Sequence, residues 1–323
     1  MKGPFPFRLF LLPLLLACHL PVVAADSYPE RPLRLVVPYP PGGAADVIGR
    51  MLARKLADDL GQQVIVDNRA GGGQVIGTDI VAKATPDGYT ILQASITHSI
   101  NPGLVSKLPY DSVRDFTPIS LLASSPLVLV VHPSVPARSV KELVSLAKAR
   151  PGALNFASAG NGSGGHLAMA LLAEMTNTRM VHVPYKGAGP ALIDLIAGQV
   201  QMIITSPLAA VPHVKAGKLR LLGVSSKART AAMPDVPAIS EAVPGYEASL
   251  WYAFLAPRGI PGNAASRLNA AVLKALALPD VRALFEKSGV EIVGSSPEDL
   301  ASFLRKEIAK WRKVIEAAGI RQG

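Results

Sequence analysis

Two glycine-rich segments of the sequence have the composition of anion-binding loops. The first, Tyr39 to Asp46, reads YPPGGAAD and lies between an apolar run and a helical pattern. Glycines leave backbone N–H groups uncovered, and the positive end of the following helix points at the same place. We therefore expect this loop to hold an anion such as a carboxylate, with contacts from Tyr39, Gly42, Gly43, Ala44, Ala45 and Asp46.

The second segment, Ser158 to Gly165, repeats this arrangement farther along the chain. It reads SAGNGSGG and again lies between a β-rich run and a helical pattern. Two such loops that face each other across a cleft can hold one carboxylate from both sides. The contacts expected from this loop come from Ser158, Ala159, Gly160, Asn161 and Gly162.

Each loop also has a purely structural explanation, because glycine permits a tight strand-to-helix turn without any ligand. The occurrence of two such loops favours binding. The segment 186–190, KGAGP, is a third candidate, although Lys186 is of a type usually found solvated. The three glycines at 71–73 are interpreted as a structural turn.

Catalytic alternatives find little support. Gly160, Gly162 and Gly165 fit the G-x-G-x-x-G dinucleotide fingerprint, but the acidic residue expected about twenty positions later is missing. Ser163 lacks the first glycine of a nucleophile elbow. Histidines outside the leader lack the paired spacing of zinc ligands; they are His98, His132, His166, His182 and His213. We expect a binding protein without catalysis, cofactor or metal.

The elements that must position these loops alternate between strands and helices. The patterns predict strands at 33–39, 64–66, 90–95 and 127–131 and a helix at 47–60. A second block has helices at 140–148, 166–175 and 191–196 and strands at 154–157, 180–185, 201–204 and 219–225. Such alternation indicates an α/β fold with parallel sheets covered by helices.

The length of 323 residues corresponds to two domains of ordinary size. Segments rich in Pro and Ser at 121–126 and 234–244 are candidate crossovers between them. The predicted first domain is discontinuous, comprising 26–123 and 251–323, and the second is 124–250. A last helix, capped by Ser296, carries an apolar stripe that is expected to pack on its own domain.

Composition and charge narrow the function classes further. A hydrophobic share of 49% and a charged share of 17% indicate globular cores rather than disorder. The net charge of +10 is spread along amphipathic helices without an aromatic stacking platform, so nucleic acid is not an expected partner. The surface should instead mildly favour anions.

Residues 1–25 have the pattern of a signal peptide, which predicts a periplasmic location. Lys2 and Arg8 precede an apolar run at 9–16, and small residues follow at 23–25. The run is too short to span a bilayer. The letters LLAC that end at Cys18 resemble a lipobox, so a lipid anchor stays open. Otherwise Cys18 leaves with the leader and cysteine chemistry is excluded.

Several motifs resemble one family of transport receptors. They occur in its order, as VPYPPGG at 37–43, PDGYT at 86–90, LPYD at 108–111, SAGNG at 158–162, VPYKG at 183–187, PHVKAGKLR at 212–220 and PDVP at 234–237. The whole mature chain thus resembles the tripartite tricarboxylate transporter substrate-binding family, also called Bug or TctC-like proteins.

This resemblance implies a type II periplasmic binding protein, or Venus flytrap, in which two α/β domains close on a ligand in the cleft between them. It implies a receptor that presents its closed form to membrane transporter subunits. We expect a monomer that carries a small carboxylate; the alternative is a binding protein used for sensing. It also implies that 42–46, 95–98 and 158–162 line the cleft and hold a carboxylate partly through water, which adds Ser95, Thr97 and His98 to the candidate site.

The sequence departs from the family pattern at two places. Ala45 stands where the family usually has a hydroxyl residue, and Thr205 and Ser206 stand where many relatives place an aspartate followed by Asn or Ser. Without that aspartate, a ligand ammonium group loses its partner. A mono-, di- or tricarboxylate or an aromatic acid is therefore a better expected ligand than an amino acid.

Overall fold

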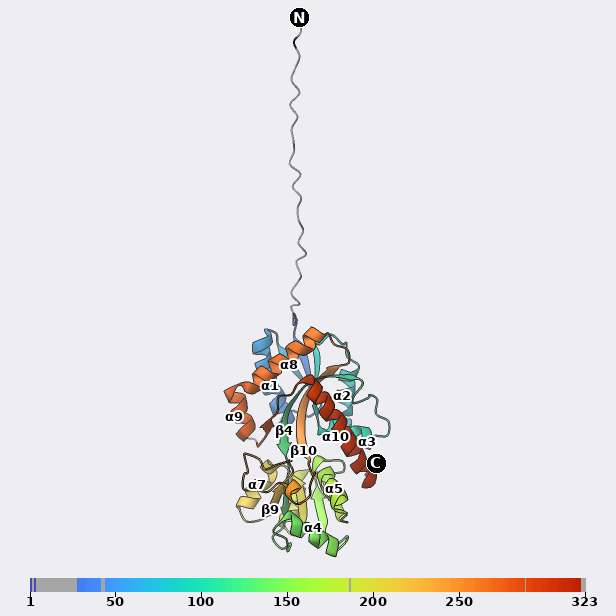
Figure 1. Ribbon diagram of the computed structural model, residues 1–323, viewed down its shortest axis with the longest axis vertical. Coiled ribbons are helices and arrows are strands. Elements are labelled where there is room, and N and C mark those ends of the chain that lie inside the picture. Colours follow the sequence, from blue (N-terminus) through green and yellow to red (C-terminus); the bar gives the residue numbers. More distant parts are fainter. Residues whose placement is uncertain (2, 4–27, 42–43, 186, 288, 321–323) are drawn as a thin grey trace.

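The computed structural model describes residues 1, 3, 28–41, 44–185, 187–287 and 289–320. The predicted leader with Cys18, the loop glycines Gly42 and Gly43, and Lys186 lie outside the described residues. The described chain forms two α/β units, each built on its own sheet and arranged one after the other along the long axis (Figure 1).

The first unit contains a six-stranded mixed sheet with the order β11-β4-β10-β3-β1-β2. β1 runs parallel to β2 and β3, whereas β10 lies antiparallel between β3 and β4. The strands are β1 (Leu33–Val37), β2 (Val64–Asn68), β3 (Thr90–Ser95), β4 (Phe116–Pro126), β10 (Ser249–Pro257) and β11 (Glu291–Ile292).

Helices cover both faces of this sheet. The face packed by α1 (Ala44–Leu60), α8 (Gly262–Ala277) and α9 (Pro279–Lys287) forms one core. The opposite face packs against α2 (Val75–Ala82), α3 (Ile96–Leu104) and α10 (Pro297–Ala317), with the short 3-10 helix η1 (Gly72–Gln74) before α2. The expected helical periodicity is observed in α1, where Leu52 and Leu56 are fully buried.

The second unit contains a five-stranded sheet with the order β7-β6-β8-β5-β9. Its strands are β5 (Val128–Val131), β6 (Asn155–Ser158), β7 (Val181–Pro184), β8 (Met202–Thr205) and β9 (Arg220–Val224). One face is covered by α4 (Val140–Ala149) and α5 (Gly164–Thr176), and the other by α6 (Ala188–Ile196) and α7 (Pro207–Lys215).

The chain crosses between the units on neighbouring strands. The segment 121–126, predicted as a crossover, lies inside β4, which leads through Leu127 into β5. The predicted second crossover, 234–244, includes the short helix η2 (Ile239–Glu241) and stays beside β9, because the Val224 N–H donates to the Pro237 carbonyl at 2.9 Å. The return is made instead through β10, while the exact domain limits stay a prediction.

Ser225 connects the two crossings. Its hydroxyl accepts a hydrogen bond from the Leu127 N–H at 2.7 Å and donates to the Ala248 carbonyl, and the Ala248 N–H donates to the Ser225 carbonyl at 2.9 Å. Ser225 is fully buried. The outgoing and returning segments are therefore joined by one buried side chain.

The last helix, α10, begins as expected. The Ser296 hydroxyl accepts from the Asp299 N–H at 3.1 Å, and Trp311 is fully buried. The helix also reaches the second unit beside α5, where Lys313 pairs with Glu174 at 3.1 Å (Figure 1). Within the described part of the chain, no helix combines the length and apolar character that a membrane span needs.

Candidate functional site

Four polar side chains form a continuous hydrogen-bonded chain at the carboxyl ends of β1 and β3. The Tyr39 hydroxyl donates to Ser95 Oγ at 2.8 Å, Ser95 Oγ donates to Gln74 Oε1 at 2.9 Å, and Gln74 Nε2 donates to Thr97 Oγ1 at 2.8 Å. We call Tyr39, Ser95, Gln74 and Thr97 the polar chain. Burial raises the pKa of Tyr39, so this phenol stays neutral and remains a donor.

The polar chain ends in a hydroxyl that can serve a ligand. Thr97 is half-buried, and its Oγ1 accepts from Gln74, which leaves the hydroxyl hydrogen to be donated elsewhere. The Thr97 side chain also lies within hydrogen-bonding reach of the Tyr39 hydroxyl, so a ligand would compete with Tyr39 for this hydrogen. The hydrogen bonds of the polar chain hold the Thr97 hydroxyl in place, where it can donate to a ligand.

Gln74 is a site residue that the sequence analysis missed. The segment at 71–73 was interpreted as a structural turn, and it is one, because Gly71, Gly72 and Gly73 all have positive φ. Gln74 itself has φ of 73°, uncommon for a residue with a side chain. The turn presents its amide to Ser95 and Thr97. A polar residue directly after three glycines was the available signal.

Asp46 supports the first loop from within α1. Its carboxylate is buried, accepts from Arg50 Nε at 3.0 Å and accepts from Asn68 Nδ2 at 2.9 Å. Asn68 Nδ2 also donates to the Tyr39 carbonyl at 3.0 Å. The Asp46 charge is thus compensated by Arg50 and by its place in the first helical turn, and the residue ties α1 to the backbone of Tyr39.

The second predicted loop follows β6 and rests on two stacked histidines. Ser158 Oγ lies 2.6 Å from His182 Nε2, and the Gly162 N–H donates to His166 Nδ1 at 3.1 Å. The two imidazole centroids are 3.7 Å apart. Burial, together with the neighbouring His182, lowers the pKa of His166 to about 4, so Nδ1 stays an acceptor at neutral pH.

This second loop meets the first unit. A Cβ placed on Gly162 would come within 2.6 Å of Leu104 Cδ2 in α3, and one on Gly164 within 2.8 Å of Leu250 Cδ2 in β10. The first turn of α5 therefore faces elements of the six-stranded unit. Gly160 and Gly162 have φ of 131° and 72°, which only glycine adopts readily.

A cavity of about 360 Å³ opens between the two units. We call it the apolar cavity. It is lined from both units and from β10, and its polar atoms come from Ser125, Ser206 and the Tyr252 hydroxyl. The main apolar lining residues are Val47, Leu208, Leu250, Tyr252, Leu284 and Phe285. Tyr252 pairs with Ser95 across β10 and β3, so the apolar cavity adjoins the polar chain.

The structure places the other predicted site residues as follows. Ala44 is the first residue of α1, and Ala45 is buried in its first turn, where its carbonyl accepts from Gln93. Ala159 and Asn161 are exposed on the second loop. Thr205 ends β8 and is buried, and Ser206 lines the apolar cavity.

His98 is the predicted residue that the structure does not bring to the site. Its Nε2 lies 2.9 Å from the Ser112 carbonyl, and its ring packs against Tyr110 and Phe116. Position 98 lies one residue beyond Thr97 on α3, which turns its side chain by about 100° around the helix and into the core. Burial lowers the pKa of His98 to about 4.

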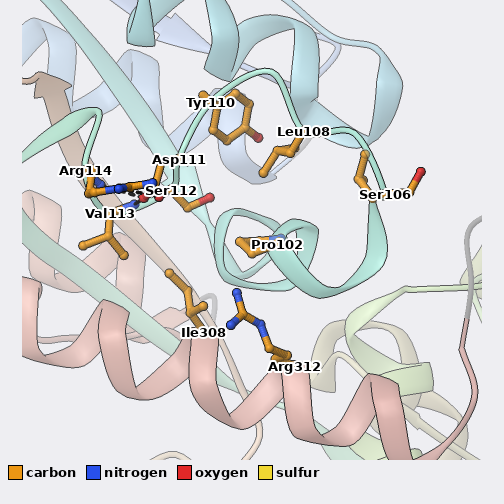
Figure 2. Close-up of a pocket in the computed structure, with 11 residues that line it drawn as sticks. Pro102, Ser106, Leu108, Tyr110, Asp111, Ser112, Val113, Arg114, Ile308 and Arg312 are labelled. Atoms are coloured by element: carbon orange, nitrogen blue, oxygen red, sulfur yellow. Dashed lines mark hydrogen bonds and ion pairs between the residues drawn. The ribbon is translucent and has the colours of Figure 1, made fainter.

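A second cavity, of about 420 Å³, is separate from this cleft (Figure 2). It lies between α3, the segment 105–114 and α10, and it shares no lining residue with the apolar cavity. Arg114, one of its cations, already pairs with Asp111 at 2.8 Å, and Arg312 extends from α10 toward Pro102. Among the described residues that line this cavity, none belongs to the polar chain.

Comparisons of the sequence and of the structure with known proteins both find relatives that cover most of this chain. Residues 48–320 match the sequence model of a family described as the tripartite tricarboxylate transporter family receptor. A relative from Pseudomonas sp. (strain P51), named "UPF0065 protein in tcbD-tcbE intergenic region", is 45% identical over 292 residues, which cover 90% of this chain and 87% of the relative.

Solved structures with similar folds include those of two relatives. The structure "R. palustris Rpa4515 with adipate" is 37% identical with a TM-score of 0.75, over 91% of this chain and 100% of that chain. The "periplasmic binding protein BugD" is 31% identical with a TM-score of 0.72, over 91% of this chain and 100% of that chain.

Proposed function

Because the chain belongs to the tripartite tricarboxylate transporter family of receptors, we propose that it captures a small carboxylate between its two α/β units and delivers it to a membrane transporter of that type. Family membership confirms the resemblance found in the sequence, the two-unit fold of a periplasmic binding protein, and the prediction of a binding protein rather than an enzyme.

The polar chain is the observation that carries the proposal. Its oriented Thr97 hydroxyl stands at the carboxyl ends of parallel strands, where α/β proteins place ligands. The first turns of α1 and α3 lie beside it and contribute backbone N–H groups of positive partial charge. A group of hydroxyl and backbone N–H donors suits a carboxylate, which only accepts hydrogen bonds.

The second loop completes the proposed site from the other unit. Its backbone is held by Ser158 and by the His166 and His182 pair, and it faces α3 and β10. A ligand carboxylate between the two loops would meet donors from both units, so its binding would favour the closed arrangement. The adipate complex of the R. palustris relative supports a carboxylate ligand.

The proposed place of action is the periplasm. The relative BugD is named a periplasmic binding protein, and residues 1–25 have the pattern of a signal peptide. We further propose that the mature protein acts as a monomer. Acylation at Cys18 would hold it at the membrane without changing the site.

The experiment replaces Thr97 by Val, which keeps the shape and removes the hydroxyl. Isothermal titration of the mature, ligand-stripped protein with a panel of carboxylates first identifies a ligand. Thr97→Val should then raise the Kd of that ligand at least tenfold, since one hydrogen bond to a charged group is lost. Thr85→Val, at an exposed position without a hydrogen bond of its side chain, is the matched control and should bind normally.

Unchanged affinity in Thr97→Val would contradict the role of the polar chain. Mass spectrometry first shows that the protein carries no ligand. If this empty protein then binds no mono-, di- or tricarboxylate in the panel, the proposed function itself is contradicted.

A further inference from the structure

The walls of the apolar cavity expose large hydrophobic side chains from both units. Val47, in the first turn of α1, is 47% exposed, and Leu208, in the first turn of α7, is 79% exposed. A single exposed leucine is ordinary on a protein surface. Here the exposed side chains line one cavity together with Leu250 and Leu284, so they form a contiguous apolar lining that water solvates poorly.

The apolar cavity adjoins the proposed carboxylate site. Ser206, one of the predicted ligand contacts, lines the cavity, and Tyr252 is the cross-strand partner of Ser95. Leu250 touches both the cavity and the first turn of α5, since a Cβ on Gly164 would lie 2.8 Å from Leu250 Cδ2. A carboxylate at the polar chain would therefore have its carbon skeleton beside the apolar walls.

The lining also argues against a second charged group on the ligand. None of the described residues that line the apolar cavity is charged, and the hydroxyls of Ser125, Ser206 and Tyr252 are its only polar side-chain groups. Burying a second carboxylate there without a cation would cost several kcal/mol. The volume of about 360 Å³ is sufficient for an aromatic ring, since benzene fits a dry cavity of ~150 Å³.

We propose that the apolar cavity holds the carbon skeleton of the ligand, so that the preferred solute is a monocarboxylate with an aromatic or branched aliphatic body. This inference rests on the proposed function and specifies its ligand class. The polar chain and the second loop bind the carboxylate, while Leu208 and Val47 close over the skeleton from opposite units.

Isothermal titration of the mature, ligand-stripped protein tests the inference with five probes: benzoate, 3-methylbutanoate, adipate, malate and benzyl alcohol. Benzoate or 3-methylbutanoate should bind at least tenfold more tightly than adipate and malate. Benzyl alcohol, which has the ring without the carboxylate, should bind at least tenfold more weakly than benzoate.

Leu208→Ser should raise the Kd of the best apolar acid roughly tenfold, because buried apolar area is lost, and should leave that of malate within about twofold. Leu208 is largely exposed, so the variant should fold normally. Ile193→Ser is the matched control, because Ile193 is 67% exposed on α6 of the same unit and does not line the cavity. Its affinities should equal those of the unchanged protein.

The outcomes separate the two proposals. Tighter binding of adipate or malate than of either monocarboxylate, or no effect of Leu208→Ser on the apolar acids, overturns the inference and leaves the proposed function standing. Equal binding of benzoate and benzyl alcohol overturns carboxylate recognition and leaves the apolar cavity as a binding site. Binding of no probe overturns the inference, and the wider carboxylate panel then decides the proposed function.

Discussion

A buried carboxylate and a ligand carboxylate would share the first loop of the site. Direct repulsion is reduced because Arg50 Nε and Asn68 Nδ2 donate hydrogen bonds to the Asp46 carboxylate, at 3.0 and 2.9 Å, and because the first turn of α1 favours negative charge. The same Asn68 amide donates to the Tyr39 carbonyl, so the orientation of the Asp46 carboxylate and the position of the polar chain both depend on one side chain. At the scale of single residues, the site is thus organised by groups that a ligand need not touch.

His98 gives a pH prediction at this scale. Burial lowers its pKa from 6.5 to about 4, so the folded state binds fewer protons than the unfolded state between these values. Above pH 6.5 His98 is neutral in both states, so its titration does not reduce the unfolding free energy. As the pH falls below 6.5 the unfolded state gains the proton first, and the unfolding free energy drops, by about 3 kcal/mol at pH 4.

His98→Phe keeps an aromatic ring beside Tyr110 and Phe116 but cannot titrate. Urea unfolding at pH 7 and at pH 4 should therefore show a smaller loss of unfolding free energy in His98→Phe than in the unchanged protein. The same loss in both proteins would mean that His98 is already protonated in the folded state or does not contribute.

At the scale of elements, glycines determine how closely a helix can pack against its sheet. Gly165 lies in the first turn of α5, and a Cβ there would overlap the Ile204 carbonyl oxygen in β8. The helix can approach the sheet closely only because this residue has no side chain. That approach places the N-terminus of α5, and with it the second loop, against β10.

Gly165→Ala should therefore move α5 outward, lower the unfolding free energy by about 1 to 3 kcal/mol and weaken ligand binding. Gly189→Ala is the matched control, because Gly189 lies in the first turn of α6 with nothing within 4 Å of an added Cβ. It should be neutral or stabilise by up to about 1 kcal/mol. Thermal unfolding with and without ligand measures both effects, and equal behaviour of the two variants would refute the packing argument.

Many of the strands and helices could be predicted from the sequence, because their periodicities are local. The helix at 47–60 and the cap at Ser296 follow from such patterns, and the two loops follow from their glycines. β4 was missed because Ser120, Ser124 and Ser125 give it the appearance of a linker, although two of these serines are buried. Gln74 could not be assigned, since its role depends on Ser95 and Thr97 being brought to it by the fold.

At the scale of the whole molecule, the two units are joined where β4 and β10 lie side by side. Both crossings leave the six-stranded sheet together, and Ser225 links Leu127 to Ala248 between them. Neighbouring crossings define one axis about which the units can rotate, as hinge closure around a ligand requires. The proposed ligand site and the crossings between the units therefore share β10, which carries Leu250 and Tyr252 at the apolar cavity.

Ser225→Ala should reveal how much this link contributes. It leaves the buried Leu127 N–H and Ala248 carbonyl without their partner, so the unfolding free energy should fall by about 1 to 3 kcal/mol. Ser240→Ala is the control, since the Ser240 hydroxyl donates to the Lys227 carbonyl at an exposed position. Its effect should stay within about 0.5 kcal/mol. Urea unfolding compares the two, and a loss as small as that of the control would show that the link is dispensable.

The position of β10 also sets the order in which the molecule can be assembled. This strand lies between β3 and β4, yet it follows the entire five-stranded unit in the sequence. As the chain emerges from the ribosome, all five strands of the second sheet precede β10, and the first sheet has a gap between β3 and β4 until residues 249–257 arrive. Such distant pairing is slow. The first sheet of a newly made chain therefore stays divided, with β3, β1 and β2 on one side and β4 on the other, until most of the sequence has been synthesised.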